Sequence, residues 1–276
     1  MKKNTPGPIG VFDSGYGGLT ILKDIQKRLP EYDYLYLGDN ARAPYGSRSF
    51  RLVYQFTLEA VRNLFEAGCN LVILACNTAS AKALRTIQQN DLPGIDANRR
   101  VLGVIRPTAE YIASTSSRHT AVLATPGTAQ SKSYTIEIDK LNPAIRVTEK
   151  GCPMWVPIVE NGEAANDGAD WFVKKYINEA LATDPEIDTF VLGCTHYPVL
   201  LPKIRQFSPQ EIRIVTQGEI VADSLADYLS RHPEMDRLCT KGGETRFLTT
   251  EDSDKFDRLA AMFLQYPVSS NKISIP

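Results

Sequence analysis

Short apolar runs alternate with longer segments of helical spacing along most of the chain. Each apolar run spans four to six residues and ends in glycine or polar residues, as buried strands do. The predicted strands are residues 9–12, 32–37, 71–76, 101–105, 120–124, 145–148, 190–193, 212–215 and 245–249. The predicted helices are residues 19–29, 49–67, 79–89, 107–114, 131–141, 169–182, 198–206, 218–230 and 253–264. Strands that alternate with helices predict an α/β fold with mainly parallel sheets.

Two segments fall outside this alternation. Residues 155–160 include Pro157 and follow Pro153, so we expect them to form a loop anchored by the two prolines. We expect the last residues, 269–276, to be poorly anchored, because chain ends fray unless a strand or helix holds them.

The second half of the chain repeats the order of the first: turn, helix, strand, loop, helix, strand, cysteine. Asp13 precedes Cys76 by 63 residues, and Thr125 precedes Cys194 by 69 residues. The polar segment 91–100, broken by Pro93 and Gly94, is a suitable crossing between two domains. We therefore predict a first α/β domain of residues 1–98 plus 214–276, and a second of residues 99–213.

Two apolar runs end in a cysteine followed by side chains that can hydrogen-bond. Residues 71–78 end in Cys76, Asn77 and Thr78, and residues 189–196 end in Cys194, Thr195 and His196. A lone cysteine at the end of a buried strand is ordinarily a small hydrophobic residue. The polar residues that follow both cysteines favour one active site with a thiol on each side. We interpret Cys69, Cys152 and Cys239 as structural.

The neighbours of the two cysteines suit acid–base chemistry. His196 can take or hold a proton beside Cys194, and Asp13 ends a strand expected next to the Cys76 strand. Neutral groups that suit the carboxylates and ammonium of an amino acid are supplied by Ser14, Asn77, Thr78, Thr125, Thr128 and Thr195. Two thiols facing each other across a substrate can remove a proton from one face of a carbon and return it to the other. This arrangement predicts racemisation or epimerisation.

Cofactor, metal and nucleotide sites are poorly supported. The predicted site loops carry no lysine that could hold pyridoxal phosphate, and the 13–18 loop is not G-x-G-x-x-G. No C-x-x-C pair occurs, and the three histidines are far apart in sequence. We expect no cofactor and no metal.

Composition narrows the class of protein further. A net charge of −1 gives no electrostatic case for nucleic acid or an anionic membrane. No apolar run approaches the ~20 residues that a membrane span needs, and residues 1–8 lack a signal-peptide core. The five cysteines are an odd number in a chain too long to need disulfides. We expect a cytoplasmic protein.

Several motifs together resemble the glutamate racemases of the aspartate/glutamate racemase superfamily. They stand in family order at residues 12–18, 38–39, 44–46, 75–79, 103–105, 124–128, 156–160 and 193–198. Gly193-Cys-Thr-His-Tyr-Pro198 is the most specific. Members regulated by a cell-wall precursor carry an N-terminal extension, and only eight residues precede Ile9 here, so we do not expect that activation.

The resemblance implies a fold, a reaction and a set of site residues. It implies two pseudo-symmetric three-layer domains, with the active site in the cleft between them, and members are commonly homodimers. It implies cofactor-independent conversion of L-glutamate to D-glutamate for peptidoglycan. Cys76 would deprotonate D-glutamate and Cys194 L-glutamate, assisted by Asp13, His196 and Glu160. The implied substrate-binding residues are Asp13, Ser14, Tyr45, Gly46, Asn77, Thr78, Thr125, Thr128, Thr195 and His196.

Three other functions remain open from the residues alone. An aspartate racemase or a related two-cysteine racemase would use the same thiols on a different amino acid. An amino-acid sensor would use the cleft without chemistry, although a sensor has no need of paired thiols. A thiol redox switch would respond to alkylation without exchanging any α-proton.

Overall fold

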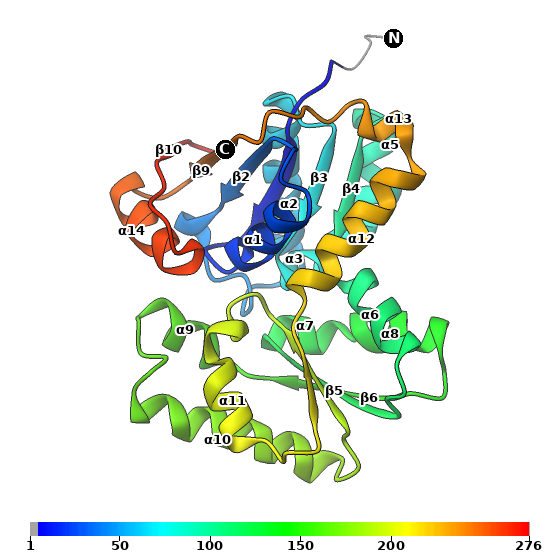
Figure 1. Ribbon diagram of the computed structural model, residues 1–276, viewed down its shortest axis with the longest axis vertical. Coiled ribbons are helices and arrows are strands. Elements are labelled where there is room, and N and C mark those ends of the chain that lie inside the picture. Colours follow the sequence, from blue (N-terminus) through cyan, green and yellow to red (C-terminus); the bar gives the residue numbers. More distant parts are fainter. Residues whose placement is uncertain (1–4, 276) are drawn as a thin grey trace.

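Two α/β domains, one above the other in Figure 1, make up the computed structural model, which describes residues 5–275. The sheet of the first domain has six strands, and every neighbouring pair is parallel. Its strands in spatial order are β10 (Ser270–Lys272), β9 (Thr245–Thr249), β2 (Tyr34–Gly38), β1 (Ile9–Asp13), β3 (Leu71–Leu74) and β4 (Arg100–Gly103).

The sheet of the second domain repeats the order of the first. Its parallel strands are β6 (Arg146–Gly151), β5 (His119–Ala124), β7 (Thr189–Gly193) and β8 (Arg213–Val215). The order β6-β5-β7-β8 matches β2-β1-β3-β4, strand for strand along the chain. The predicted α/β fold with two pseudo-symmetric domains is confirmed.

Helices cover both faces of each sheet, so each domain has three layers. The helices of the first domain are α1 (Gly18–Arg28), α2 (Phe50–Glu66), α3 (Asn77–Lys82), α4 (Leu84–Thr86), α5 (Leu92–Ile95), α12 (Gly218–Arg231), α13 (Pro233–Asp236) and α14 (Ser253–Leu264). Those of the second domain are α6 (Ile105–Ser114), α7 (Pro126–Ser131), α8 (Ser133–Leu141), α9 (Trp155–Glu160), α10 (Asp167–Thr183) and α11 (Leu201–Phe207). Short 3-10 segments occupy Asn40–Arg42 and Tyr197–Leu200, and a π-helical turn occupies Ile87–Asp91.

The buried strands explain why the apolar runs are continuous rather than alternating. Every residue of β1, β2, β3 and β7 is buried, because helices cover both faces of the sheet. In the first domain, α1, α12 and α14 pack on one face, and α2, α3 and α5 pack on the other. In the second domain, α9, α10 and α11 pack on one face, and α6 and α8 pack on the other.

The sheet pairing changes where the chain crosses between domains. Residues 100–103 form β4 and pair with β3, so they belong to the first sheet, although the prediction placed them in the second domain. Backbone pairing decides this, and the polar segment that precedes β4 gave no sign of it. The first crossing therefore follows Gly103. The chain returns after β8, so residues 214 and 215, which the prediction placed in the first domain, belong to the second sheet. The tail completes the first domain with β9 and β10, as expected.

Two local predictions were wrong. Residues 155–160 form helix α9 rather than a loop. Pro157 is its third residue, where the backbone N–H has no partner inside the helix, so a proline loses nothing there. The tail is also anchored: Ser270–Lys272 form β10, which pairs with β9 through backbone hydrogen bonds that need no apolar side chains.

Within residues 5–275, none of the helices combines the length and the apolar character that crossing a bilayer requires.

Candidate active site

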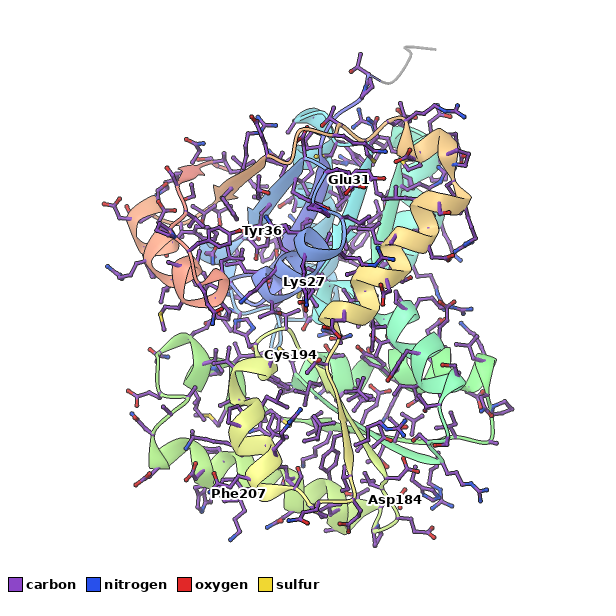
Figure 2. The ribbon with its side chains drawn as sticks, in the orientation of Figure 1. Lys27, Glu31, Tyr36, Asp184, Cys194 and Phe207 are labelled. Carbon is purple, nitrogen blue, oxygen red and sulfur yellow. The ribbon has the colours of Figure 1, made fainter. Side chains whose placement is uncertain are left out.

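The two cysteines lie at equivalent ends of equivalent strands. Cys76 follows β3 and Cys194 follows β7, each at the carboxyl end of its strand, where ligands bind in open parallel sheets. Figure 2 shows Cys194 at the level where the two domains meet. Both cysteines line one cavity of about 160 Å³ between the domains. The structure therefore brings the two thiols to a single site.

Most of the predicted site residues line this cavity. Those that do are Ser14, Tyr45, Gly46, Cys76, Asn77, Thr78, Thr125, Glu160, Cys194, Thr195 and His196. Asp13 and Thr128 are buried directly behind the lining rather than in it.

Cys76 directly precedes helix α3 and is held by neutral hydrogen bonds. Its Sγ accepts a hydrogen bond from the Ala79 backbone N–H at 3.4 Å, and the Ser14 hydroxyl lies 3.4 Å from the same sulfur. Burial and the nearby Asp13 carboxylate raise the pKa of the Cys76 thiol to about 12, against the lowering effect of those two contacts. Cys76 is therefore a protonated thiol at neutral pH.

Cys194 has a charged partner instead. The Nδ1 atom of His196 lies 3.9 Å from the Cys194 sulfur, and its Nε2 atom lies 3.0 Å from Glu160 Oε1. Burial alone would lower the pKa of His196, but the contacts with Cys194 and Glu160 raise it to about 10. His196 therefore stands between the Cys194 sulfur and the Glu160 carboxylate and contacts both.

Glu160 is the last residue of α9, the segment expected to be a loop. Its helix directs the carboxylate at the His196 ring, as part of a chain from Glu160 through His196 to Cys194. The predicted assistance of Glu160 thus has a geometric basis, because a carboxylate bonded to one imidazole nitrogen orients the ring and favours its protonated form.

Asp13 acts on the site from behind. Its Oδ2 atom accepts a hydrogen bond from the Gly15 N–H at 2.8 Å, and the side chain is 1% exposed. Burial raises the pKa of Asp13, while the His196 charge and backbone hydrogen bonds oppose that shift. Since Asp13 does not line the cavity, it influences Cys76 through its charge and through the shape of the 13–18 turn.

Gly17 shows why that turn needs glycine. A Cβ at Gly17 would lie 2.3 Å from Thr195 Oγ1 and 2.4 Å from His196 Nδ1, both in the second domain. The start of α1 therefore presses its backbone against the Cys194 turn. No side chain fits between the two halves at this point.

Three threonine hydroxyls join the two domains beside the cavity. Thr78 Oγ1 lies 3.0 Å from Thr125 Oγ1 and 3.3 Å from Thr128 Oγ1, and the last two lie 3.0 Å apart. Thr78 lies in the first turn of α3 in the first domain. In the second domain, Thr125 directly precedes α7 and Thr128 lies in its first turn. The triad fixes how the two helix starts meet.

The side chain of Asn77 is committed to a buried network. Its Nδ2 donates to Gln217 Oε1 at 2.7 Å, and its Oδ1 accepts from the Tyr134 hydroxyl at 2.6 Å. Gln217 also donates to Tyr134 and to Thr108. The Asn77 amide therefore ties the Cys76 turn to Gln217, at the second crossing of the chain, and to Tyr134 in the second domain.

Some lining residues were not predicted to belong to the site. An apolar wall comes from the segment between β6 and the end of α9 and consists of Cys152, Pro153, Val156 and Pro157. Cys152 is fully buried and its carbonyl accepts from Tyr197, which fits the structural interpretation, although it also lines the cavity. Ala43, Pro44, Ser47 and Pro126 also line the cavity.

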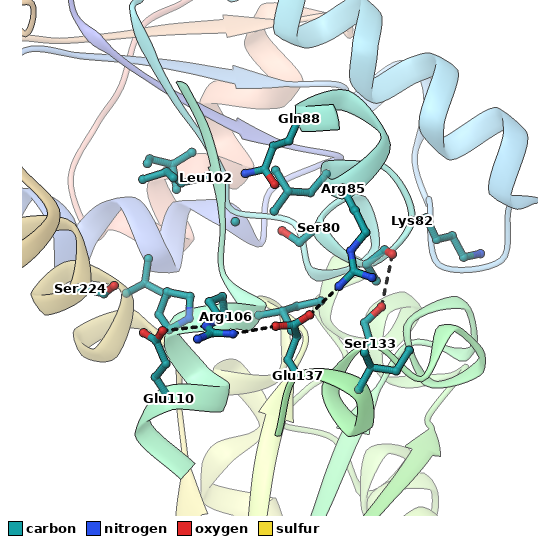
Figure 3. A pocket seen from close by; sticks show the side chains of 18 of the residues that line it. Ser80, Lys82, Arg85, Gln88, Leu102, Arg106, Glu110, Ser133, Glu137 and Ser224 are labelled. Carbon is teal, nitrogen blue, oxygen red and sulfur yellow. Dashed lines mark hydrogen bonds and ion pairs between the residues drawn. The ribbon is translucent and has the colours of Figure 1, made fainter. Parts of the chain in front are cut away.

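A second, larger cavity of about 610 Å³ lies at the same domain junction but contains neither thiol. Figure 3 shows the ion pairs that line it. Glu137 accepts from Arg85 and Arg106, and Arg106 also pairs with Glu110. Arg85 belongs to the first domain and Glu137 to the second, so this pair crosses the junction.

Comparison with known proteins agrees with this geometry. The model of the Asp/Glu/Hydantoin racemase family matches residues 17–224. The glutamate racemase of Ruegeria sp. (strain TM1040) is 38% identical over 272 residues, which cover 95% of this chain and 98% of that protein.

Solved structures of glutamate racemases share the whole fold. Isoform RacE1 from Bacillus anthracis has a TM-score of 0.88 at 32% identity, over 98% of each chain. The enzyme of Francisella tularensis, solved in complex with D-glutamate, has a TM-score of 0.86 at 31% identity, over 99% of this chain and 98% of that one. The chain therefore belongs to the Asp/Glu/Hydantoin racemase family and is an amino-acid racemase of the glutamate racemase type.

Proposed function

We propose that the protein interconverts L- and D-glutamate by moving the α-proton between two thiols. The observation that carries this proposal is the pair of cysteines in one cavity, one from each domain, each with its own hydrogen-bonding partners. Two-base racemisation needs an acid and a base on opposite faces of one carbon, and this pair supplies both.

The two thiols exchange one proton each with the substrate. In its thiolate form, Cys194 removes the α-proton of L-glutamate and becomes a thiol, beside the His196 ring. Cys76, a thiol whose pKa is raised to about 12, donates its proton to the opposite face and becomes a thiolate. D-Glutamate leaves with the Cys76 proton, and the two sulfurs have exchanged charge. The same steps in reverse convert D-glutamate to L-glutamate.

The cavity suits a substrate with two carboxylates held by neutral donors. No lysine or arginine is among the described residues that line it. Hydroxyls of Ser14, Thr78, Thr125 and Thr195 are available beside the backbone N–H groups of the 45–47 loop. We keep Asp13 and Thr128 as supporting residues, since both stand behind this lining.

The biological role follows as part of the proposal. D-Glutamate made this way would supply peptidoglycan synthesis and so affect cell-wall biogenesis and cell shape. The similarity to glutamate racemases supports this role. We also propose a cofactor-independent, cytoplasmic homodimer, which sedimentation, cell fractionation and metal analysis of the purified protein would test.

The decisive experiment follows L-glutamate with cofactor-free protein in D2O, by optical rotation and by NMR of the α-position. Inversion together with α-deuteration is the expected result. L-Aspartate is run in parallel. If aspartate alone inverts, the substrate is aspartate and not glutamate. If neither amino acid inverts or exchanges its α-proton, the proposal fails. Binding of an amino acid without chemistry is then the function to test.

A further inference from the structure

Three buried side chains form a closed ring of hydrogen bonds where the two domains meet. Asn77 Nδ2 donates to Gln217 Oε1 at 2.7 Å, and Gln217 Nε2 donates to the Tyr134 hydroxyl at 2.7 Å. That hydroxyl donates to Asn77 Oδ1 at 2.6 Å, so each member of the ring donates to the next. Gln217 Nε2 also donates to Thr108 Oγ1 at 2.8 Å. Asn77 and Gln217 are 2% exposed, and Tyr134 and Thr108 are fully buried.

The ring is complete without a ligand. Within residues 5–275, none of these four side chains has a buried polar atom that lacks a partner. The Thr108 hydroxyl, for example, donates to the Val104 carbonyl at 2.8 Å while it accepts from Gln217. Removing one member would leave the others unsatisfied in buried surroundings, which is costly. The ring is therefore a rigid connection between the segments that carry its members.

Gln217 connects both domains and both crossings of the chain. It lies at the second crossing, between β8 and α12, and its Nε2 atom is 3.4 Å from the carbonyl of Val104, at the first crossing. Tyr134 and Thr108 belong to α8 and α6 of the second domain. Asn77 is the first residue of α3 in the first domain. One amide side chain thus contacts four segments that are distant in the sequence.

This connection reaches one of the two thiols. Asn77 directly follows Cys76, whose sulfur contacts only Ser14 and Ala79 of its own domain among the described hydrogen bonds. Those contacts do not set the position of Cys76 relative to Cys194. The Asn77 amide does bear on that position, because its partners lie in the second domain and at the crossing. Gln217 itself does not line the cavity that contains the thiols.

We propose that Gln217 is a positioning residue that holds Asn77, and with it the Cys76 thiol, in line with Cys194 across the substrate. This inference rests on the proposed function and adds to it a residue outside the cavity. Proton transfer requires close alignment, and a displacement of about 1 Å lowers a rate by about 100-fold. Because the connection ends at Asn77, its loss slows proton transfer at Cys76 more than at Cys194.

The test is Gln217→Met, assayed with L- and D-glutamate carrying hydrogen or deuterium at the α-carbon. Methionine keeps the length of glutamine and loses its hydrogen bonds. We expect kcat/KM to fall about tenfold or more. The fall is equal for both substrates, because enantiomers are equally stable in water.

The isotope effects on kcat/KM identify which thiol is affected. D-Glutamate gives its α-proton to Cys76, and L-glutamate gives its α-proton to Cys194. When transfer at Cys76 becomes the slow step, the isotope effect rises for D-glutamate and falls for L-glutamate. A merely structural role would reduce the amount of active enzyme and leave both isotope effects unchanged.

A second variant interrupts the ring at another member. Tyr134→Phe removes one hydroxyl and keeps the aromatic ring, so we expect the same change in the isotope effects. The double variant should be no slower than Gln217→Met alone, because both substitutions open the same ring.

Gln26→Met is the matched control. The Gln26 amide donates to Thr245 Oγ1 at 2.9 Å and accepts from the Tyr266 hydroxyl at 3.2 Å, within the first domain. Gln26 does not line the cavity with the thiols. The same substitution therefore removes hydrogen bonds without touching the ring, and we expect wild-type rates and isotope effects.

The outcomes separate this inference from the proposed function. Wild-type kcat/KM in folded Gln217→Met, or a lower kcat/KM with unchanged isotope effects, overturns the role of Gln217 and leaves the racemase intact. A wild type that does not invert glutamate overturns both proposals. Thermal unfolding shows whether each variant is folded. If Gln217→Met does not fold, Tyr134→Phe decides by the same isotope effects.

Discussion

At the scale of single residues, the two thiols differ more than their equivalent positions suggest. The Cys76 sulfur contacts the Ser14 hydroxyl and the Ala79 backbone N–H, and the Asp13 carboxylate lies nearby. A thiolate on Cys76 would be stabilised only by those two neutral contacts. Cys194 meets an imidazole that is itself bonded to Glu160. The same side chain therefore has neutral hydrogen-bonding partners on one wall and an ionisable partner on the other.

Replacing either thiol by a hydroxyl should stop racemisation in both directions. Serine keeps the size of cysteine but is far less acidic, so we expect Cys76→Ser and Cys194→Ser each to lower kcat by about 10²–10⁴. Polarimetry with L- and D-glutamate measures this. Cys239→Ser is the control, because Cys239 is buried in the first domain away from the cavity. Wild-type turnover in either active-site variant would rule out the two-base mechanism.

The charge on His196 should make stability depend on pH. Its pKa is raised from 6.5 to about 10 in the folded protein, mainly by Cys194 and Glu160 acting against burial. A raised folded pKa means that protonated His196 stabilises the native state fully below pH 6.5, and that this stabilisation is lost as pH rises through 10.

His196→Gln is the variant that isolates this contribution. We expect the difference in unfolding free energy between wild type and His196→Gln to be largest at pH 6 and to shrink steadily towards pH 10. Urea unfolding at each pH measures it. A difference that grows with pH would show that His196 is neutral in the folded protein.

At the scale of the element, the site is made where a strand ends and a helix begins. Cys76 is the residue just before α3, Thr125 is the residue just before α7, and Gly17 is the residue just before α1. The side chain just before a helix accepts from free backbone N–H groups, as Cys76 and Thr125 do here. We therefore expect activity to depend on how closely the N-terminal ends of α1, α3 and α7 approach each other.

Gly17→Ala tests that closeness. The added Cβ would overlap Thr195 and His196, so the α1 start and the Cys194 turn must separate. We expect kcat/KM for glutamate to fall at least tenfold and unfolding free energy to drop by about 1–3 kcal/mol. Gly168→Ala is the control, since a Cβ there meets nothing within 4 Å. Equal activity in the two variants would contradict the role given to this contact.

Most helices and strands, and the position of both thiols at strand ends, could be predicted from the sequence for physical reasons. A strand that is buried on both faces has a continuous run of apolar residues in the sequence. The bounds predicted for such strands lie within a few residues of the observed ones. Cysteine, threonine and histidine at the ends of such runs stood out, because nothing in a core needs them.

The parts that sequence could not supply depend on contacts between distant segments. In the sequence, Asp39 looks like an ordinary polar loop residue. Only the fold places the hydroxyls of Tyr45 and Thr250 where they donate hydrogen bonds to its carboxylate. β10 is polar and exposed along most of its length, so only its pairing with β9 identifies it. The edge strand β4 begins at an exposed arginine, which hid its place in the first sheet.

At the scale of the whole molecule, the carboxyl-terminal segment completes the first domain and reaches the junction. Phe263 of α14 packs against the cores of both domains, with its ring edge-on to His196 at 6.0 Å between centroids. Ile273 and Ile275, which follow β10, pack on the opposite face of the first sheet. The tail therefore wraps the edge of that sheet from both sides.

Removing residues 266–276 should weaken the first domain. The deletion takes away β10 and the contacts of Ile273 and Ile275. Each kcal/mol of lost stability lowers Tm by about 2–4 °C in a protein of this size class, so we expect a fall of several degrees. Calorimetry measures the shift. A truncated protein with the Tm of the full chain would show that β10 adds no stability.

The matching strand order of the two sheets also has an evolutionary consequence. Two identical halves encoded by one short gene would have to mutate together, so any change beside one thiol would appear beside the other. Two halves within one polypeptide have separate codons and are free of that constraint. Each sulfur can therefore have its own neighbours, Ser14 beside Cys76 and His196 with Glu160 beside Cys194. A single substitution can change the surroundings of one sulfur and leave those of the other as they were.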